Sequence, residues 1–190
     1  MQTGSIHNAY RSALGVALVT AFILLLPLLA MQVSDEVAWA PADFALAGTL
    51  LFGTGLTYKL LAKKMGDIGY RLAIGVALAA ALGLVWVNLA VGIIGKEGDP
   101  ANLMYVGVLA VGITGSIIVR FQPQGMARVL LATAIVQTLV TVIALFAGWG
   151  APSGGPAQVI ALNGFFVVSF AGSAWLFRCA ARRRNEQGSI

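Results

Sequence analysis

Apolar residues gather into six long runs that short polar breaks separate. Each run is near the roughly 20 residues that a helix needs to cross about 30 Å of hydrocarbon. The runs do not alternate strictly between apolar and polar residues, as the strands of a membrane barrel would. The pattern therefore predicts six transmembrane helices, over residues 12–33, 44–61, 72–94, 103–119, 129–149 and 159–177.

Composition agrees with a membrane protein. Of the 190 residues, 59% are apolar and 10% are charged, which would leave a soluble domain with too little polar surface. We therefore expect one all-α membrane domain over residues 1–190, in contact with the lipid bilayer. The run at 12–33 is long for a signal peptide and has no clean cleavage site after it, so we expect it to be a helix of the mature protein.

The net charge of +5 is a topology signal. If the six runs alternate in direction, 11 of the 12 Lys and Arg residues lie on one side and only Lys96 on the other. Asp35, Glu36, Asp43, Glu97 and Asp99 lie opposite the basic side. The positive-inside rule then predicts cytoplasmic N- and C-termini and a multi-pass protein of the bacterial cytoplasmic (inner) membrane. This distribution accounts for the charge without a nucleic-acid partner.

A repeated unit connects the six runs. The stretch from Tyr10-Arg11 matches the stretch from Tyr70-Arg71 at seven of nine positions, and Arg128 starts a third, diverged copy. A Pro-Ala-polar triplet follows in each copy, at Pro41, Pro100 and Pro156. These landmarks predict three tandem helical hairpins of one orientation, over residues 10–64, 70–121 and 127–184, around a pseudo-threefold axis along the membrane normal.

The triplets have a structural interpretation at helix starts. Proline suits the first helical position, because its missing N–H would have no partner there, and a nearby polar side chain can bind the free amides. An anion site at three such N-termini is disfavoured by the acidic residues around them. The predicted N-terminal capping residues are Pro41, Asp43, Asp99, Pro100, Asn102, Pro156 and Gln158.

Glycines concentrate in the second helix of each hairpin, where they would permit close contact between backbones. We therefore expect the second, fourth and sixth helices to pack centrally and the other three to face lipid more fully. Hydroxyl side chains recur in near-layers along the same helices. They line a narrow polar path or bond to carbonyls of their own helices; the residues are Thr54, Thr57, Thr114, Ser116, Ser169 and Ser173.

Three amides lie within the apolar runs, at Asn88, Gln137 and Asn163. An unpaired amide in hydrocarbon is costly, so each should face protein or water. They either join helices or coordinate a small polar solute, and their positions are not equivalent between repeats. We expect Asn88 to lie deeper than the belt of aromatic residues at the helix ends.

Catalytic and metal-binding patterns are not apparent in the sequence. The apolar runs carry no ionisable residue near mid-bilayer, and the single His7 lies in the N-terminal segment. We therefore expect no enzymatic activity, no metal and no cofactor.

In bare architecture the three hairpins resemble mitochondrial carriers, but the prolines of those carriers lie near the inner ends of odd-numbered helices, and Pro41, Pro100 and Pro156 open even-numbered helices on the outer side. That match is rejected. In size and style the chain resembles the small uncharacterised membrane proteins of bacteria, a likeness that transfers no functional residues.

Two functions remain open. The first is a non-catalytic accessory subunit, or a self-associating component, of a membrane complex. The second is a channel or facilitator for a small neutral solute or cation, which the repeat, the hydroxyl layers and the acidic outer face favour.

Overall fold

The chain is all-α. The computed structural model describes residues 3–33, 38–64, 67–90, 92–95, 99–150 and 155–187. These residues form six α-helices and one short 3-10 helix, with no strand among them: α1 (Thr3–Val33), α2 (Pro41–Lys64), α3 (Ile68–Ala90), η1 (Pro100–Leu103), α4 (Met104–Ile118), α5 (Pro123–Phe146) and α6 (Gly155–Gln187). Each predicted span corresponds to a helical segment long and apolar enough to cross a membrane. The prediction of a multi-pass membrane protein is confirmed.

The chain divides into two compact units, Met1–Lys63 and Lys64–Ile190. The boundary coincides with the end of the first predicted repeat, whereas the second and third repeats share one unit. Among the charged residues behind the topology prediction, Asp35, Glu36, Lys96 and Glu97 lie outside the described residues.

The first unit contains α1 and α2, which meet through individual side chains. A Cβ atom at Gly55 of α2 would lie 2.8 Å from Cγ1 of Val16 in α1, so glycine is what allows the helices to approach there. At the C-terminal end of α2, Lys63 Nζ donates a hydrogen bond of 3.0 Å to Ser12 Oγ of α1. A side chain of α1 packed against a glycine of α2 and one polar bridge thus join the two helices.

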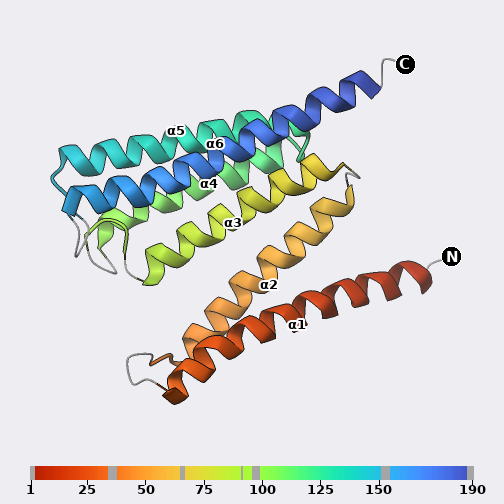
Figure 1. Cartoon of the computed structure of the whole chain (residues 1–190), viewed down its shortest axis with the longest axis horizontal. Helices are drawn as coiled ribbons and strands as arrows, with labels where there is room; N and C mark the ends of the chain where they lie inside the picture. The colour runs from red at the N-terminus through yellow and green to blue at the C-terminus, as the bar shows by residue number, and fades with distance from the viewer. Residues whose placement is uncertain are drawn as a thin grey trace. The chain divides into compact units, whose positions relative to one another are not determined.

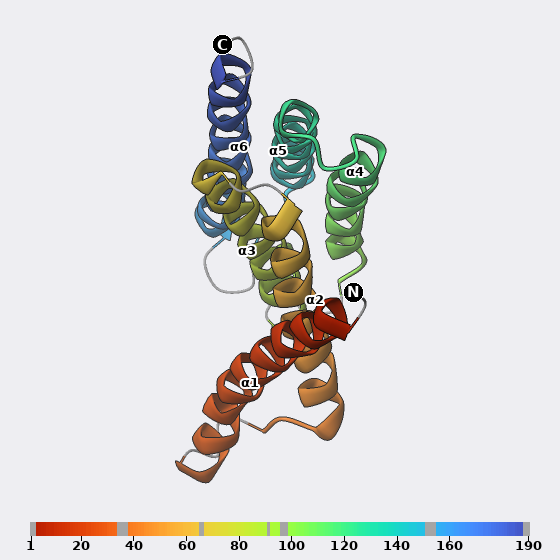
Figure 2. The same cartoon turned by 90° about the vertical axis from the view of Figure 1, so that its right-hand side faces the viewer.

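The second unit contains α3 to α6, which alternate in direction (Figure 1). α5 lies between α4 and α6 (Figure 2). α3 packs mainly against α6 and makes few contacts with α4, so the helices are arranged in the order α4–α5–α6–α3. The third predicted hairpin is therefore a closely packed pair, whereas the second is not. The pseudo-threefold symmetry of the whole chain stays a prediction.

Burial within the second unit differs from the expectation based on glycine content. α6 is well buried as expected, but α5 is more buried than α4. α5 is more buried because it packs against a helix on each side, α4 and α6. α4 packs extensively only against α5. Gly107 of α4 has no described atom within 4 Å of the position its Cβ would take, so this glycine serves no close contact there. The prediction was wrong for α4 and α5.

Helix ends explain where the predicted spans differ from the observed ones. α5 ends in a Schellman motif, in which Trp149 N–H donates to Ala144 O at 2.9 Å and Gly148 takes a φ of 70°. α4 ends in the same motif with Arg120 in the left-handed position, at a φ of 51°. α3 ends at Ala90 instead of continuing to residue 94, because Gly92 has a left-handed φ of 70°.

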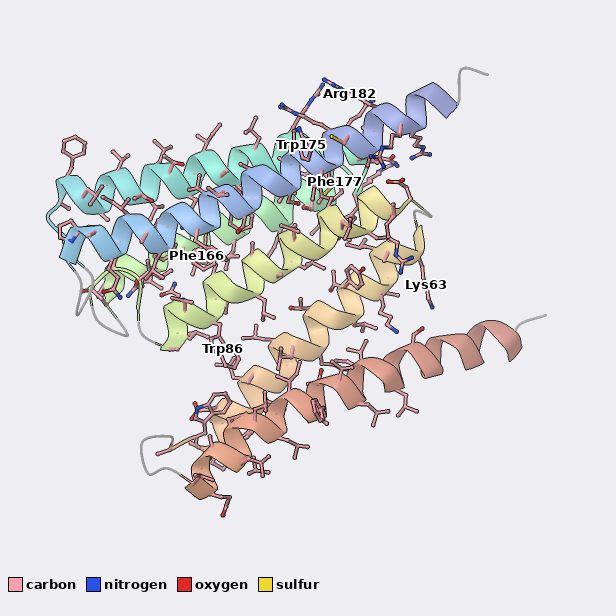
Figure 3. All side chains as sticks on the ribbon, viewed as in Figure 1. Lys63, Trp86, Phe166, Trp175, Phe177 and Arg182 are labelled. Atoms are coloured by element: carbon pink, nitrogen blue, oxygen red, sulfur yellow. The ribbon has the colours of Figure 1, made fainter. Side chains whose placement is uncertain are left out.

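The two ends of the second unit differ in charge. At one end, Tyr70 Oη donates to Phe121 O at 3.2 Å and ties the start of α3 to the α4–α5 connection. Arginines of this unit lie near that end, including Arg182 on α6 (Figure 3). At the opposite end, Gly95 N–H donates to Gly150 O at 2.9 Å, and the acidic residue Asp99 caps η1.

Candidate functional site

A buried polar cluster joins α4, α5 and α6. Tyr105 Oη of α4 donates to Asn163 Oδ1 of α6 at 3.0 Å, and Gln137 Nε2 of α5 donates to the same oxygen at 2.7 Å. Gln137 and Asn163 are both 0% exposed. One amide oxygen thus receives two donors from two neighbouring helices. We call these three residues the amide cluster.

Chemistry fixes the orientation of both amides in the cluster. Asn163 Nδ2 donates to Val159 O at 2.8 Å, and a carbonyl oxygen can only accept. Asn163 Oδ1 must therefore face Tyr105 and Gln137, so the Gln137 atom that contacts it must be the Nε2 donor. Gln137 Oε1 then points elsewhere, and among the described residues it has no hydrogen-bond partner.

The amide cluster lies in the half of the unit that contains the α5–α6 connection. Gln137 precedes the end of α5 at Phe146 by 9 residues, which is roughly 13 Å along the axis. Tyr105 is the second residue of α4 and reaches the same depth through the length of its side chain. The cluster is therefore well inside the predicted span and not at its surface.

Asn88 and Asn102 form a separate group at the same end of the unit. Asn88 Nδ2 donates to Asn102 O at 3.1 Å. The Asn102 side chain accepts from Ile93 N at 3.2 Å and Ile94 N at 3.0 Å, and it donates to Ile94 O at 2.9 Å. Asn88 lies in the last turn of α3, close to the helix end at Ala90, so the expectation that it lies deep in the span was wrong.

Asn102 fixes the backbone of two apolar residues, Ile93 and Ile94, which follow α3. Ile93 and Ile94 are fully buried although they follow the end of α3. The Asn102 side chain bonds to three backbone groups of this segment, the two isoleucine N–H groups and the carbonyl of Ile94. Buried backbone groups require such partners, because they have no access to water. We call residues 92–95, fixed by Asn102, the isoleucine turn.

Replacing Asn102 with alanine should release the isoleucine turn. Two amides and one carbonyl lose their partners, at about 1 kcal/mol of net stability for each bond. We expect hydrogen exchange at the Ile93 and Ile94 amides to become at least about tenfold faster, since 1.4 kcal/mol corresponds to a factor of ten. Exchange measured by mass spectrometry or NMR in detergent checks this, with Thr114→Val, which lies away from the turn, as the control.

Unchanged protection of both amides in Asn102→Ala would contradict the assignment. Asn102→Asp is a graded test, because a carboxylate still accepts from the two amides but does not donate to Ile94 O. Its effect should fall between those of the wild type and the alanine variant.

The hydroxyl layers mostly satisfy their own helices. Thr57, Thr114, Ser116 and Ser169 each donate to the carbonyl four residues earlier. Thr54 is half-exposed on α2. Ser173 differs, because its Oγ donates to Ala73 O of α3 at 2.7 Å and thereby joins α6 to α3. Among the hydroxyls of the second unit, Thr114 is exposed whereas Ser116 and Ser173 are buried, so these side chains do not share one surface.

The predicted capping residues have several distinct roles. Asp43 Oδ2 accepts from Ala40 N at 2.7 Å, which is half of a capping box at the start of α2, where Pro41 is the first residue. Asp99 caps η1 by accepting from Ala101 N at 2.9 Å, and Pro100 begins that helix. In the third repeat α6 begins at Gly155, and Pro156 and Gln158 lie in its first turn.

Two further residues with hydrogen-bonding roles were not predicted from the sequence. Tyr105 lies near the start of α4, and its ring is buried and its hydroxyl belongs to the amide cluster. Asp67 lies directly before α3, and its Oδ2 accepts from Tyr70 N at 2.9 Å at the start of that helix. The signal for Asp67 was available, because an acidic residue directly before an apolar run is a typical N-cap.

The amide cluster offers neutral hydrogen-bond chemistry. Amide and phenol groups orient a neutral polar group, and they supply neither a nucleophile paired with a base nor a charge. Comparison with known protein families, curated proteins and solved structures finds no significant match to the chain.

Proposed function

We propose that the protein is a non-catalytic component of a membrane assembly, either an accessory subunit of a larger complex or a self-associating scaffold. The amide cluster is the observation that carries the proposal. Tyr105 and Gln137 both donate to Asn163 and so join α4, α5 and α6, which is how polar groups stabilise helix packing in membranes.

Other polar side chains support the same interpretation. Ser173 joins α6 to α3, Asn102 fixes the isoleucine turn, and four hydroxyls bond to their own helices. Side chains that join helices and loops in this way produce a rigid helix bundle. Its outer surface is available for contact with lipid or with other transmembrane helices. That is what a structural component requires.

We infer that the arginine-rich end of the second unit, and with it both termini, faces the cytoplasm of a bacterial inner membrane. The uneven distribution of basic residues supports this orientation. Cys179, the single cysteine, lies on α6 at this end. A membrane-impermeant maleimide should label Cys179 in inverted membrane vesicles and leave it unlabelled in intact spheroplasts. A Cys179→Ser/Trp149→Cys variant should show the reverse, and identical labelling from the outside for both would overturn the orientation.

Association in the membrane tests the proposed function. Two differently tagged copies are co-expressed at low level, crosslinked in the membrane, extracted in mild detergent and isolated through one tag. We expect the second tag, or a stoichiometric partner, to be recovered, and light scattering to give a mass above that of one 19.7 kDa chain with its detergent subtracted. A monomer without a partner, before and after crosslinking, would refute the proposal. Copies mixed only after extraction are the control for association in detergent.

A channel or facilitator for a small neutral solute or cation is the second candidate. The unpartnered Gln137 Oε1 favours its neutral-solute form, because this oxygen is available to a donor inside the span. Proteoliposomes that take up neutral solutes no faster than protein-free liposomes would count against it.

A further inference from the structure

We propose that the amide cluster is a binding site for one small neutral hydrogen-bond donor, a water molecule, which Gln137 Oε1 holds between α4, α5 and α6. This goes beyond the proposed function, because joining helices requires only the bonds already described. The polar groups of the cluster differ in how far their hydrogen-bonding capacity is used.

The Asn163 side chain has hydrogen-bond partners for both its oxygen and its nitrogen. Asn163 Oδ1 receives two donors, and Asn163 Nδ2 is bonded to Val159 O. Gln137 Oε1 is the exception among the described residues, a buried acceptor with no partner. Rotating the Gln137 amide by 180° does not help, because two amide oxygens would then face each other at the 2.7 Å contact.

An unsatisfied acceptor of this kind has a substantial penalty. Leaving a buried polar group without a hydrogen bond costs about 1–3 kcal/mol, and buried water commonly satisfies such groups. The adjoining Tyr105 Oη keeps lone pairs after it donates its proton to Asn163. The unpartnered Gln137 Oε1 and the lone pairs of Tyr105 Oη are both acceptors, so a ligand that they hold must have protons to donate.

The surroundings select a neutral ligand. The amide cluster has no formal charge, and on α5 the nearest charged residue, Arg128, is 9 residues from Gln137, roughly 13 Å along the helix. A cation bound there would lack a counter-charge, and burying an unpaired ion costs several kcal/mol. Complete burial of Gln137 and Asn163 further favours the smallest donor. Water meets both conditions.

Water-edited solid-state NMR of the protein in liposomes tests the proposal. Magnetisation transferred from water is followed at the side-chain amide of Asn163, with the methyl groups of Val140, a buried residue of α5, as a dry reference. We expect Asn163 to receive magnetisation at early mixing times, as residues at the helix ends do, and well before Val140. Transfer to Asn163 as slow as transfer to Val140 in the wild-type protein would overturn the proposal.

Two variants show whether Gln137 holds the water. Gln137→Leu removes the acceptor, and we expect early transfer to Asn163 to be lost. Thr138→Val is the matched control, because Thr138 is the next residue, faces away from the cluster and bonds to Ala134 O; early transfer should persist. Early transfer that survives in Gln137→Leu would assign the water to another group and refute the role of Gln137. Association of the chains, which tests the proposed function, is read out separately.

Discussion

Asn163→Leu is expected to be the most destabilising substitution of a single polar residue in the second unit. The change leaves Tyr105 Oη and Gln137 Nε2 without the acceptor they share, in a region where both are buried. Each of the two orphaned donors costs about 1–3 kcal/mol, so we expect a loss of about 2–6 kcal/mol in the free energy of unfolding. Reversible unfolding in mixed micelles, followed by circular dichroism or tryptophan fluorescence, measures it.

A triple variant separates orphaned donors from poor packing. Tyr105→Phe and Gln137→Leu, added to Asn163→Leu, remove both donors along with the acceptor, and replacing all partners by apolar groups of similar shape is often nearly neutral. We expect the triple variant to recover most of the lost stability. If Asn163→Leu alone unfolds like the wild type, the amide cluster does not stabilise the bundle. If the triple variant is as unstable as the single one, the loss comes from shape instead of hydrogen bonding.

Gly115→Leu should disrupt the contact between α4 and α5. A Cβ atom at Gly115 would lie 2.7 Å from Cγ1 of Val129 and 3.4 Å from its Cβ. Val129 is buried and β-branched, so its side chain has little freedom to turn away. Overpacking of this kind costs about 1–3 kcal/mol, and we expect the upper part of that range because leucine adds further atoms. The same unfolding measurement applies.

Gly107→Leu is the matched control on the same helix. Gly107 is exposed, with no described atom within 4 Å of its Cβ position, so leucine there should leave stability unchanged or slightly higher. Adding Val129→Ala to Gly115→Leu should restore part of the loss by making room. Equal unfolding free energies for Gly115→Leu and Gly107→Leu would show that the close approach of α4 and α5 is not required.

The sequence by itself determined the secondary structure of this protein and its placement in a lipid bilayer. Runs of about 20 apolar residues have one stable form in a bilayer, the helix, because every backbone group must be satisfied internally. Local capping followed from residue type in the same way, since Asp43 and Asp99 act within three residues of their own positions. These features depend on neighbours along the chain, so the pattern of residues contains them.

Helix neighbours were decided only by the tertiary structure. Glycine content indicated that α4 lies centrally, yet a glycine permits close packing without requiring it, and Gly107 is open whereas Gly115 is in contact. Tyr105, Gln137 and Asn163 occupy unrelated places in the repeat, and they meet because α5 lies between α4 and α6. The sequence showed that each amide within an apolar run needs a hydrogen-bond partner. Which partner it finds depends on the packing of helices distant in the chain.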